Sequence, residues 1–141
     1  MVTIDDLYAL AEEHHIPVDC FDLKNCDSLS MQDGDQCYIA INPLKLKDSI
    51  DEKMKLVHEL GHCATGSFYN QYAALDIRAQ HENRANKWAI KKLLPFEAMK
   101  EAMDNGYVEV HQLAEYFEVS EGLVRKAYTY YTEQQGLNFN L

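Results

Sequence analysis

The amino-terminal segment repeats apolar residues three and four positions apart, at Ile4, Leu7, Tyr8, Leu10 and Ala11. This spacing is typical of a helix with one apolar face. Thr3, followed three residues later by Asp6, has the pattern of a capping box at the start of that helix. We therefore predict a helix that begins after Thr3 and ends before Pro17.

Between residues 18 and 42 the apolar period changes from helical spacing to two, which is typical of strands. The segments 18–21, 29–31 and 37–41 carry the alternation. Asp33-Gly34 separates the last two segments, and this dipeptide readily adopts the positive φ angles of a tight hairpin. Pro43 then ends the region. We predict short strands, two of them joined as a hairpin.

The helical period returns after residue 48. Ser49 and Glu52 have the spacing of a second capping box, and the helix that they open should end near Gly66. Another helix is predicted over residues 76–94, because Pro95 cannot continue it. Three shorter helices should follow from residue 96, separated at residues 105–106 and 119–120.

This order of elements, helix, small sheet and then helices, predicts an α+β fold. We expect a small antiparallel sheet packed on a helical bundle. The length of 141 residues suits a single domain over residues 1–141, with the helices from about residue 96 as its extension. The segment 113–127 also has the pattern of a helix-turn-helix.

Charge argues against nucleic acid and anionic membranes as partners. The chain carries a formal net charge of −10, which repels phosphate groups. From residue 107 onward five acidic residues outnumber two basic ones, a net of −3, where a DNA-binding surface needs a basic stripe. No stretch reaches the roughly 20 apolar residues that a membrane span requires.

The acidic start of the chain lacks the basic and apolar segments of a signal peptide, so we expect a cytoplasmic protein. Four cysteines stand at irregular spacing, and we expect them to be reduced, buried thiols: Cys20, Cys26, Cys37 and Cys63. A structural zinc site of Cys20, Cys26 and Cys37 is the less favoured alternative, because it lacks short ligand spacing.

The candidate chemistry lies on the helix opened by Ser49, which carries the pattern His-Glu-x-x-His. His58 and His62 are one helical turn apart, so their imidazoles can meet at one metal ion. Glu59 can face the same cleft as the base that activates water. Gly61 costs a helix about 1 kcal/mol relative to Ala. Its presence indicates that another part of the chain approaches closely there.

A catalytic zinc ion usually takes three protein ligands. On the following helix, Glu82, Ala85, Asn86 and Ala89 share one face, so Glu82 is the expected third ligand. Asn86 is expected to hydrogen-bond a ligand histidine from outside the metal's own ligand set. His81 competes with Glu82, but adjacent helical residues point about 100° apart. We expect His81 to support the site and not to bind the metal.

These motifs resemble the ImmA/IrrE family of metallo-endopeptidases, within the gluzincin group. The resemblance rests on the runs 58–62, 82–89 and 93–95, and on the strand 39–43 before the motif helix. It implies one zinc ion per chain, held by His58, His62 and Glu82, with Glu59 catalytic. It also implies a regulatory protease, associated with phages or other mobile elements, that cleaves a helix-turn-helix repressor.

The sequence does not identify the residue that donates a hydrogen bond to the oxyanion. Tyr69 and Tyr72, in the loop between the two helices, are the candidates, because a phenol can donate a hydrogen bond over a metal site. We expect the peptide substrate to bind along an exposed strand. Two alternatives to a protease remain: a non-catalytic metal-binding interaction module, and a DNA-binding regulator, which the charge disfavours.

Overall fold

The computed structural model describes residues 1–69 and 72–139, and its contacts divide the chain into two compact units. The first, here the amino-terminal unit, comprises Thr3–Trp88. The second, the carboxy-terminal unit, comprises Ala89–Leu141 together with Met1–Val2. The expectation of a single domain over residues 1–141 stays a prediction.

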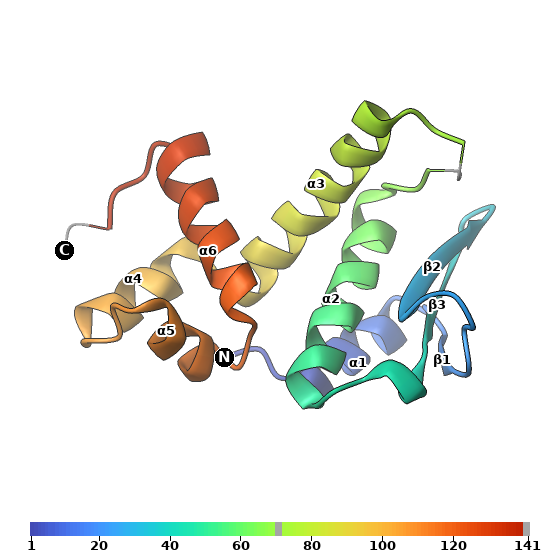
Figure 1. The fold of residues 1–141 in the computed structure, drawn as a ribbon, viewed down its shortest axis with the longest axis horizontal. Coiled ribbons are helices and arrows are strands. Elements are labelled where there is room, and N and C mark those ends of the chain that lie inside the picture. Colours follow the sequence, from blue (N-terminus) through green and yellow to red (C-terminus); the bar gives the residue numbers. More distant parts are fainter. Residues whose placement is uncertain (70–71, 140–141) are drawn as a thin grey trace. The chain divides into compact units, whose positions relative to one another are not determined.

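The amino-terminal unit places a three-stranded sheet against the long helix α2 (Figure 1). Its elements are α1 (Ile4–Glu13), β1 (Val18–Cys20), β2 (Ser28–Asp33), β3 (Gln36–Ile41), a short 3₁₀ turn (Pro43–Lys45), α2 (Ser49–Thr65) and most of α3 (Leu75–Leu93). The predicted α+β class is confirmed.

The sheet is mixed rather than wholly antiparallel. Its strand order is β1-β3-β2; β2 pairs antiparallel with β3, and β1 pairs parallel with β3. The β2–β3 hairpin is the predicted one, with Gly34 at φ 62°. Strand β1 is not joined to β3 by a turn, so no hairpin dictates its direction. The position of β2 at the edge of the sheet matters for the site below.

One face of the sheet forms the core with α2. Ile39 and Ile41 of β3 point to this face and are buried, as are Leu56 and Leu60 of α2. Because side chains alternate along a strand, the residues of β2 that pair with Ile39 and Ile41 share the same face. They are Ser30 and Ser28. The inner face of the edge strand is therefore polar where it meets α2.

The ends of the helices are set largely by local residues. Thr3 and Asp6 form the predicted capping box of α1. The predicted cap of α2 is off by one residue, because the side chain of Asp48, and not that of Ser49, accepts a hydrogen bond from the Asp51 N–H, at 2.8 Å. The helix ends as predicted at Gly66, which has φ 64°.

The cysteines differ from expectation. Cys37 on β3 and Cys63 on α2 form a disulfide, so the expectation of four reduced thiols is wrong for this pair. The two residues are 26 positions apart and meet because β3 packs on the final turns of α2. Cys20 and Cys26 are free, the first exposed and the second half-buried. The bond ties the sheet to the helix that carries the His-Glu-x-x-His pattern.

The carboxy-terminal unit contains the three short helices that the sequence predicts, α4 (Phe96–Asp104), α5 (Val110–Phe117) and α6 (Glu121–Thr129), followed by a π-helical turn (Tyr130–Gln134). The chain turns between α5 and α6 at Glu118, with φ 54°, and Ser120 caps α6. This is the helix-turn-helix-like pattern expected from the sequence.

Within residues 1–69 and 72–139, no helix combines the length and the apolar character needed to cross a membrane.

Candidate metal centre

The two histidines of the motif lie together on α2. Their Nε2 atoms are 3.3 Å apart, and the rings meet edge to face with centroids separated by 4.8 Å. His62 is buried and His58 is about one-third exposed. The spacing of one helical turn thus brings both imidazoles to a single point, as the sequence predicts.

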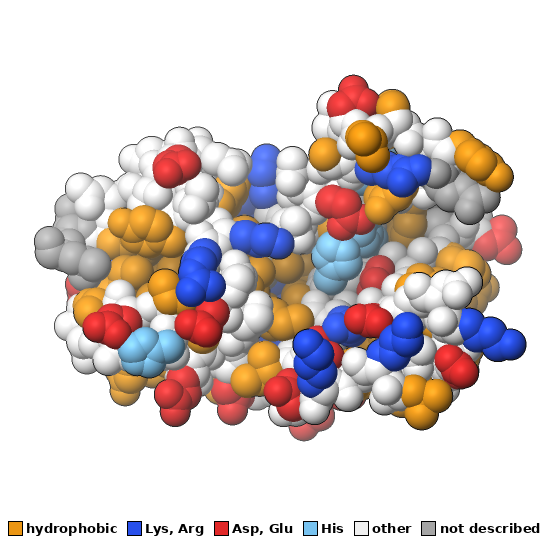
Figure 2. Space-filling model, in the orientation of Figure 1, with side chains coloured by type: hydrophobic (Ala, Val, Ile, Leu, Met, Phe, Trp, Pro, Cys, Tyr) orange, Lys and Arg blue, Asp and Glu red, His pale blue; other side chains and the backbone are white. Residues whose placement is uncertain are grey.

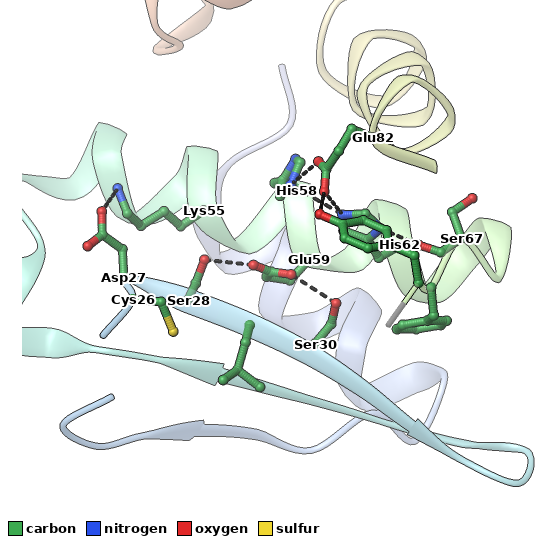
Figure 3. Close-up of a pocket in the computed structure, with 13 residues that line it drawn as sticks. Cys26, Asp27, Ser28, Ser30, Lys55, His58, Glu59, His62, Ser67 and Glu82 are labelled. Carbon is green, nitrogen blue, oxygen red and sulfur yellow. Dashed lines mark hydrogen bonds and ion pairs between the residues drawn. The ribbon is translucent and has the colours of Figure 1, made fainter. Parts of the chain in front are cut away.

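Glu82 reaches the same point from α3. One carboxylate oxygen lies 3.0 Å from His58 Nε2, and the other lies 3.3 Å from His62 Nε2 (Figure 3). One ligand atom from each of the three residues fits within a mutual separation of 4.8 Å. Two imidazole nitrogens and a carboxylate oxygen are a donor set that zinc takes in catalytic sites. The residues present therefore fit a metal ion.

The close approach of the two helices makes this meeting possible. Gly61, one residue before His62, packs against the backbone of Ala85, which is three residues after Glu82 and completely buried. The expectation that something approaches Gly61 closely is confirmed.

A backbone carbonyl orients His62. The Nδ1 atom lies 2.5 Å from the carbonyl oxygen of Ser67, in the loop after α2. Because a carbonyl can only accept, Nδ1 is the donor, and Nε2 of the neutral ring carries the lone pair that a metal needs. Asn86 was expected in such a role. Within residues 1–69 and 72–139, the polar partners of the two histidine rings are the Ser67 carbonyl, Glu82 and each other, and Asn86 is not among them.

Glu59 is buried beside the histidines and belongs to a different set of contacts. Its two carboxylate oxygens accept hydrogen bonds from the hydroxyl groups of Ser28 and Ser30 on β2. It is not one of the three clustered donors. This separation leaves the carboxylate available for proton transfer instead of metal binding.

The site opens into a pocket of about 620 Å³ between α2, β2 and the loop after α2. Figure 2 shows histidine and acidic side chains meeting at a hollow on the face that α2 and α3 line. Besides the histidines, Glu59 and Glu82, the described residues that line the pocket are Cys26, Asp27, Ser28, Leu29, Ser30, Lys55, Ser67, Phe68 and Tyr69. The pocket therefore runs along the edge strand.

The two tyrosine candidates lie differently. The hydroxyl of Tyr69 donates a hydrogen bond of 2.8 Å to Glu82, and this bond, together with partial burial, raises the pKa of the phenol. Tyr72 is 85% exposed and is not among the pocket-lining residues. Of the two, Tyr69 is the one within reach of the site.

His81 stacks on the ring of Tyr69, with centroids 5.9 Å apart. Its Nδ1 atom is buried and has no hydrogen-bond partner in the described part of the chain. It stands outside the cluster of three donors, and Glu82 occupies the position nearest the histidines. His81 thus contacts the tyrosine that contacts Glu82.

Three serines of the site were missed from the sequence: Ser28, Ser30 and Ser67. Ser67 acts through its backbone, which no side-chain pattern reveals. Ser28 and Ser30 stand two residues apart on a strand, which places both side chains on one face. This spacing was the only sequence signal for the pair, but it does not identify the helix that packs against that face of the strand.

An α+β fold with a His-Glu-x-x-His helix, a third carboxylate on the next helix and an adjoining pocket defines a metallopeptidase-type domain. The chain belongs to the peptidase M78 family, described as the IrrE N-terminal-like domain, whose model matches residues 11–129. The predicted ImmA/IrrE resemblance is thereby confirmed. No curated protein and no solved structure matches the chain significantly.

Proposed function

We propose that the protein is a zinc-dependent endopeptidase. The observation that carries the proposal is the convergence of the Nε2 atoms of His58 and His62 with the carboxylate of Glu82, beside a second, separate carboxylate on Glu59. A site that only bound a metal would have no need of the second carboxylate. The family membership supports peptidase activity.

His58, His62 and Glu82 would hold one zinc ion (Zn²⁺) per chain. Bound there, zinc would act as a Lewis acid that polarises the peptide carbonyl and makes water a better nucleophile. The hydrogen bond from His62 Nδ1 to the Ser67 carbonyl fixes the ring so that Nε2 faces the other donors.

Glu59 would take a proton from the attacking water and return it to the leaving amine, because a buried carboxylate next to the reacting atoms suits both steps. Tyr69 would donate a hydrogen bond to the oxyanion as it forms, after its hydroxyl leaves Glu82. Tyr72 is the weaker candidate for that donor because it is exposed to solvent.

The peptide would bind along β2. This strand pairs on one side with β3 and forms the edge of the sheet next to the pocket, so its other side can accept an extended chain. Main-chain hydrogen bonds of this kind make little demand on sequence. Selectivity would then come from the side chains that line the pocket.

The proposed substrate is a protein, a helix-turn-helix repressor of a phage or other mobile element, and the proposed location is the cytoplasm. Both points rest on the resemblance of the motifs. The acidic composition adds only that DNA is disfavoured as a partner. A non-catalytic interaction module is the alternative that the proposal must exclude.

The test combines metal analysis with proteolysis. Purified protein should carry about one zinc per chain. The zinc-loaded protein should cleave a member of a peptide library, and the repressor encoded beside its gene, as detected by mass spectrometry. Zinc without cleavage of either substrate would favour the interaction module, and absence of zinc would refute the metal site.

A further inference from the structure

Two hydroxyl groups hold the carboxylate of Glu59, one on each oxygen. Ser28 Oγ donates to Oε2 at 2.7 Å, and Ser30 Oγ donates to Oε1 at 2.9 Å (Figure 3). Glu59 itself is 5% exposed. A carboxylate has about four lone-pair sites, so two of them stay available after these bonds. The carboxylate can therefore be held by the serines and still accept a proton.

Both donors come from a strand, whereas the carboxylate comes from a helix. Ser28 and Ser30 point to the same face of β2 because they pair with Ile41 and Ile39 of β3, whose side chains lie in the core against α2. A one-residue slip of β2 would turn both hydroxyl groups away from Glu59. The position of the carboxylate thus depends on the register of the sheet.

The disulfide reinforces this register. Cys37 is the second residue of β3, and its bond to Cys63 attaches the strand to α2 four residues after Glu59. Since β3 is the neighbour of β2 along the whole hairpin, the bond limits how far β2 can move from the helix. The bond therefore holds the β2–β3 hairpin, which carries the two serines, against α2, which carries Glu59.

We propose that Ser28 and Ser30 are positioning residues that hold Glu59 at the orientation needed for proton transfer. The inference rests on the proposed function. A glutamate side chain turns about three bonds, and two donors on separate oxygens fix both the place and the plane of its carboxylate. The donors sit on the strand that the peptide would join, so a peptide docked on β2 also steadies the base.

A purely structural role makes a different prediction. Buried polar groups are almost always hydrogen-bonded, and two serines satisfying a buried carboxylate would on that ground stabilise the fold alone. Their removal would then lower stability and leave the turnover of the folded enzyme unchanged. A positioning role instead lowers kcat in protein that is folded and loaded with metal, with little change in KM.

The experiment compares Ser28→Ala, Ser30→Ala and the double variant with the parent, using a peptide that the zinc-loaded parent cleaves. We expect the double variant to lose about 10- to 100-fold in kcat, as for other residues that orient a group at a metal site. The KM should stay within about twofold. Ser30→Thr keeps a hydroxyl group on the strand, so its kcat should recover most of what Ser30→Ala loses.

Ser49→Ala is the matched control, because it removes an exposed hydroxyl group from the first turn of α2, where Asp48 provides the cap. It should leave kcat unchanged. Zinc content, measured for every variant, should equal that of the parent, since neither Ser28 nor Ser30 belongs to the cluster of metal donors.

A second measurement needs no activity. In metal-free parent protein, Ser30→Ala should lower the folding equilibrium constant about tenfold. The same substitution should have a much smaller effect in the Glu59→Ala background, because the hydrogen bond from Ser30 to the charged carboxylate is already absent there. Equal effects in both backgrounds would overturn the contact. Parent-like kcat in the folded, zinc-loaded double variant would overturn the positioning role, whereas a parent that neither binds zinc nor cleaves would overturn the proposed function.

Discussion

A Cβ atom placed on Gly61 would lie 2.7 Å from the carbonyl oxygen of Ala85. Helices α2 and α3 therefore meet backbone to backbone one residue before His62 and one turn after Glu82. Only glycine allows this approach, because the neighbouring atoms belong to the main chain and cannot rotate away. The distance between the histidines and the third carboxylate is set here.

Replacing Gly61 by alanine should therefore damage the metal site. The added methyl group has to push α3 away from α2, which we expect to cost about 1–3 kcal/mol of stability. Glu82 moves with α3, so zinc affinity should fall as well. Urea denaturation of the metal-free protein and a zinc titration measure the two effects.

Gly122→Ala is the control for that substitution. Gly122 lies in α6, and a Cβ atom there would meet only the Ser120 hydroxyl, at 3.9 Å. Alanine is the better helix former, so this variant should gain up to about 1 kcal/mol. If Gly61→Ala is equally stabilised and binds zinc like the parent, the packing of α2 on α3 does not depend on the close approach of Gly61 to Ala85.

The identity of the third metal ligand can be tested by replacing Glu82 and its neighbour His81 by alanine, one at a time. Glu82→Ala should weaken zinc binding by more than about 100-fold, since its two oxygens face His58 and His62. His81→Ala should keep one zinc per chain and change activity only modestly, because His81 contacts the ring of Tyr69 instead. Competition with a fluorescent chelator measures both affinities. The opposite ranking would make His81 the ligand.

Glu59→Gln should separate binding from chemistry. The amide keeps the shape of the side chain but cannot accept a proton from water, so activity should fall about 100-fold or more. Zinc content should not change, because Glu59 is outside the cluster of donors. A variant that binds zinc and cleaves at the parent rate would remove Glu59 from the mechanism.

Local sequence spacing accounts for what could be predicted of this site. His58 and His62 converge because of helical periodicity, and Gly61 signals a close neighbour because glycine is costly within a helix. The capping box of α1, the hairpin glycine and the proline after α3 likewise act within a few residues. These patterns were sufficient for the α+β class and for most element boundaries.

The remaining features depend on contacts between distant segments. Ser28 and Ser30 lie about 30 residues before Glu59, with separations of 31 and 29, and only the docking of β2 on α2 brings them together. The Cys37–Cys63 bond depends on the packing of β3, the neighbour of β2, on the same helix. The parallel pairing of β1 was missed for a related reason, since no turn joins it to β3.

The disulfide is itself open to test. Denatured but unreduced protein should titrate two thiols, those of Cys20 and Cys26, and four after reduction. Breaking a bond that closes a loop of 26 residues should cost about 2–4 kcal/mol in urea denaturation. Four thiols in protein isolated from the cytoplasm under alkylation would instead support the reduced state expected from the irregular spacing of the cysteines.

Tyr131 provides a pH-dependent test of the carboxy-terminal unit. It is buried, its hydroxyl donates a hydrogen bond of 2.7 Å to the carbonyl of Leu94, and burial raises its pKa to about 12. Burial also raises the pKa of Tyr8, in the amino-terminal unit, to about 12. Each phenol is neutral in the folded state at a pH where the unfolded chain, with a pKa of 10.0, already ionises.

A raised pKa stabilises the fold below the unfolded value and ceases to do so as pH rises through the folded value. The melting temperature should therefore fall between about pH 10 and pH 12. Tyr131→Phe should cost about 1–3 kcal/mol at neutral pH, because the Leu94 carbonyl loses its donor. The melting temperature of Tyr131→Phe should fall less steeply at alkaline pH than that of the parent. Tyr8→Phe should remove the share of the fall that comes from Tyr8. An unchanged alkaline slope in both variants would mean that neither phenol is held neutral by the fold.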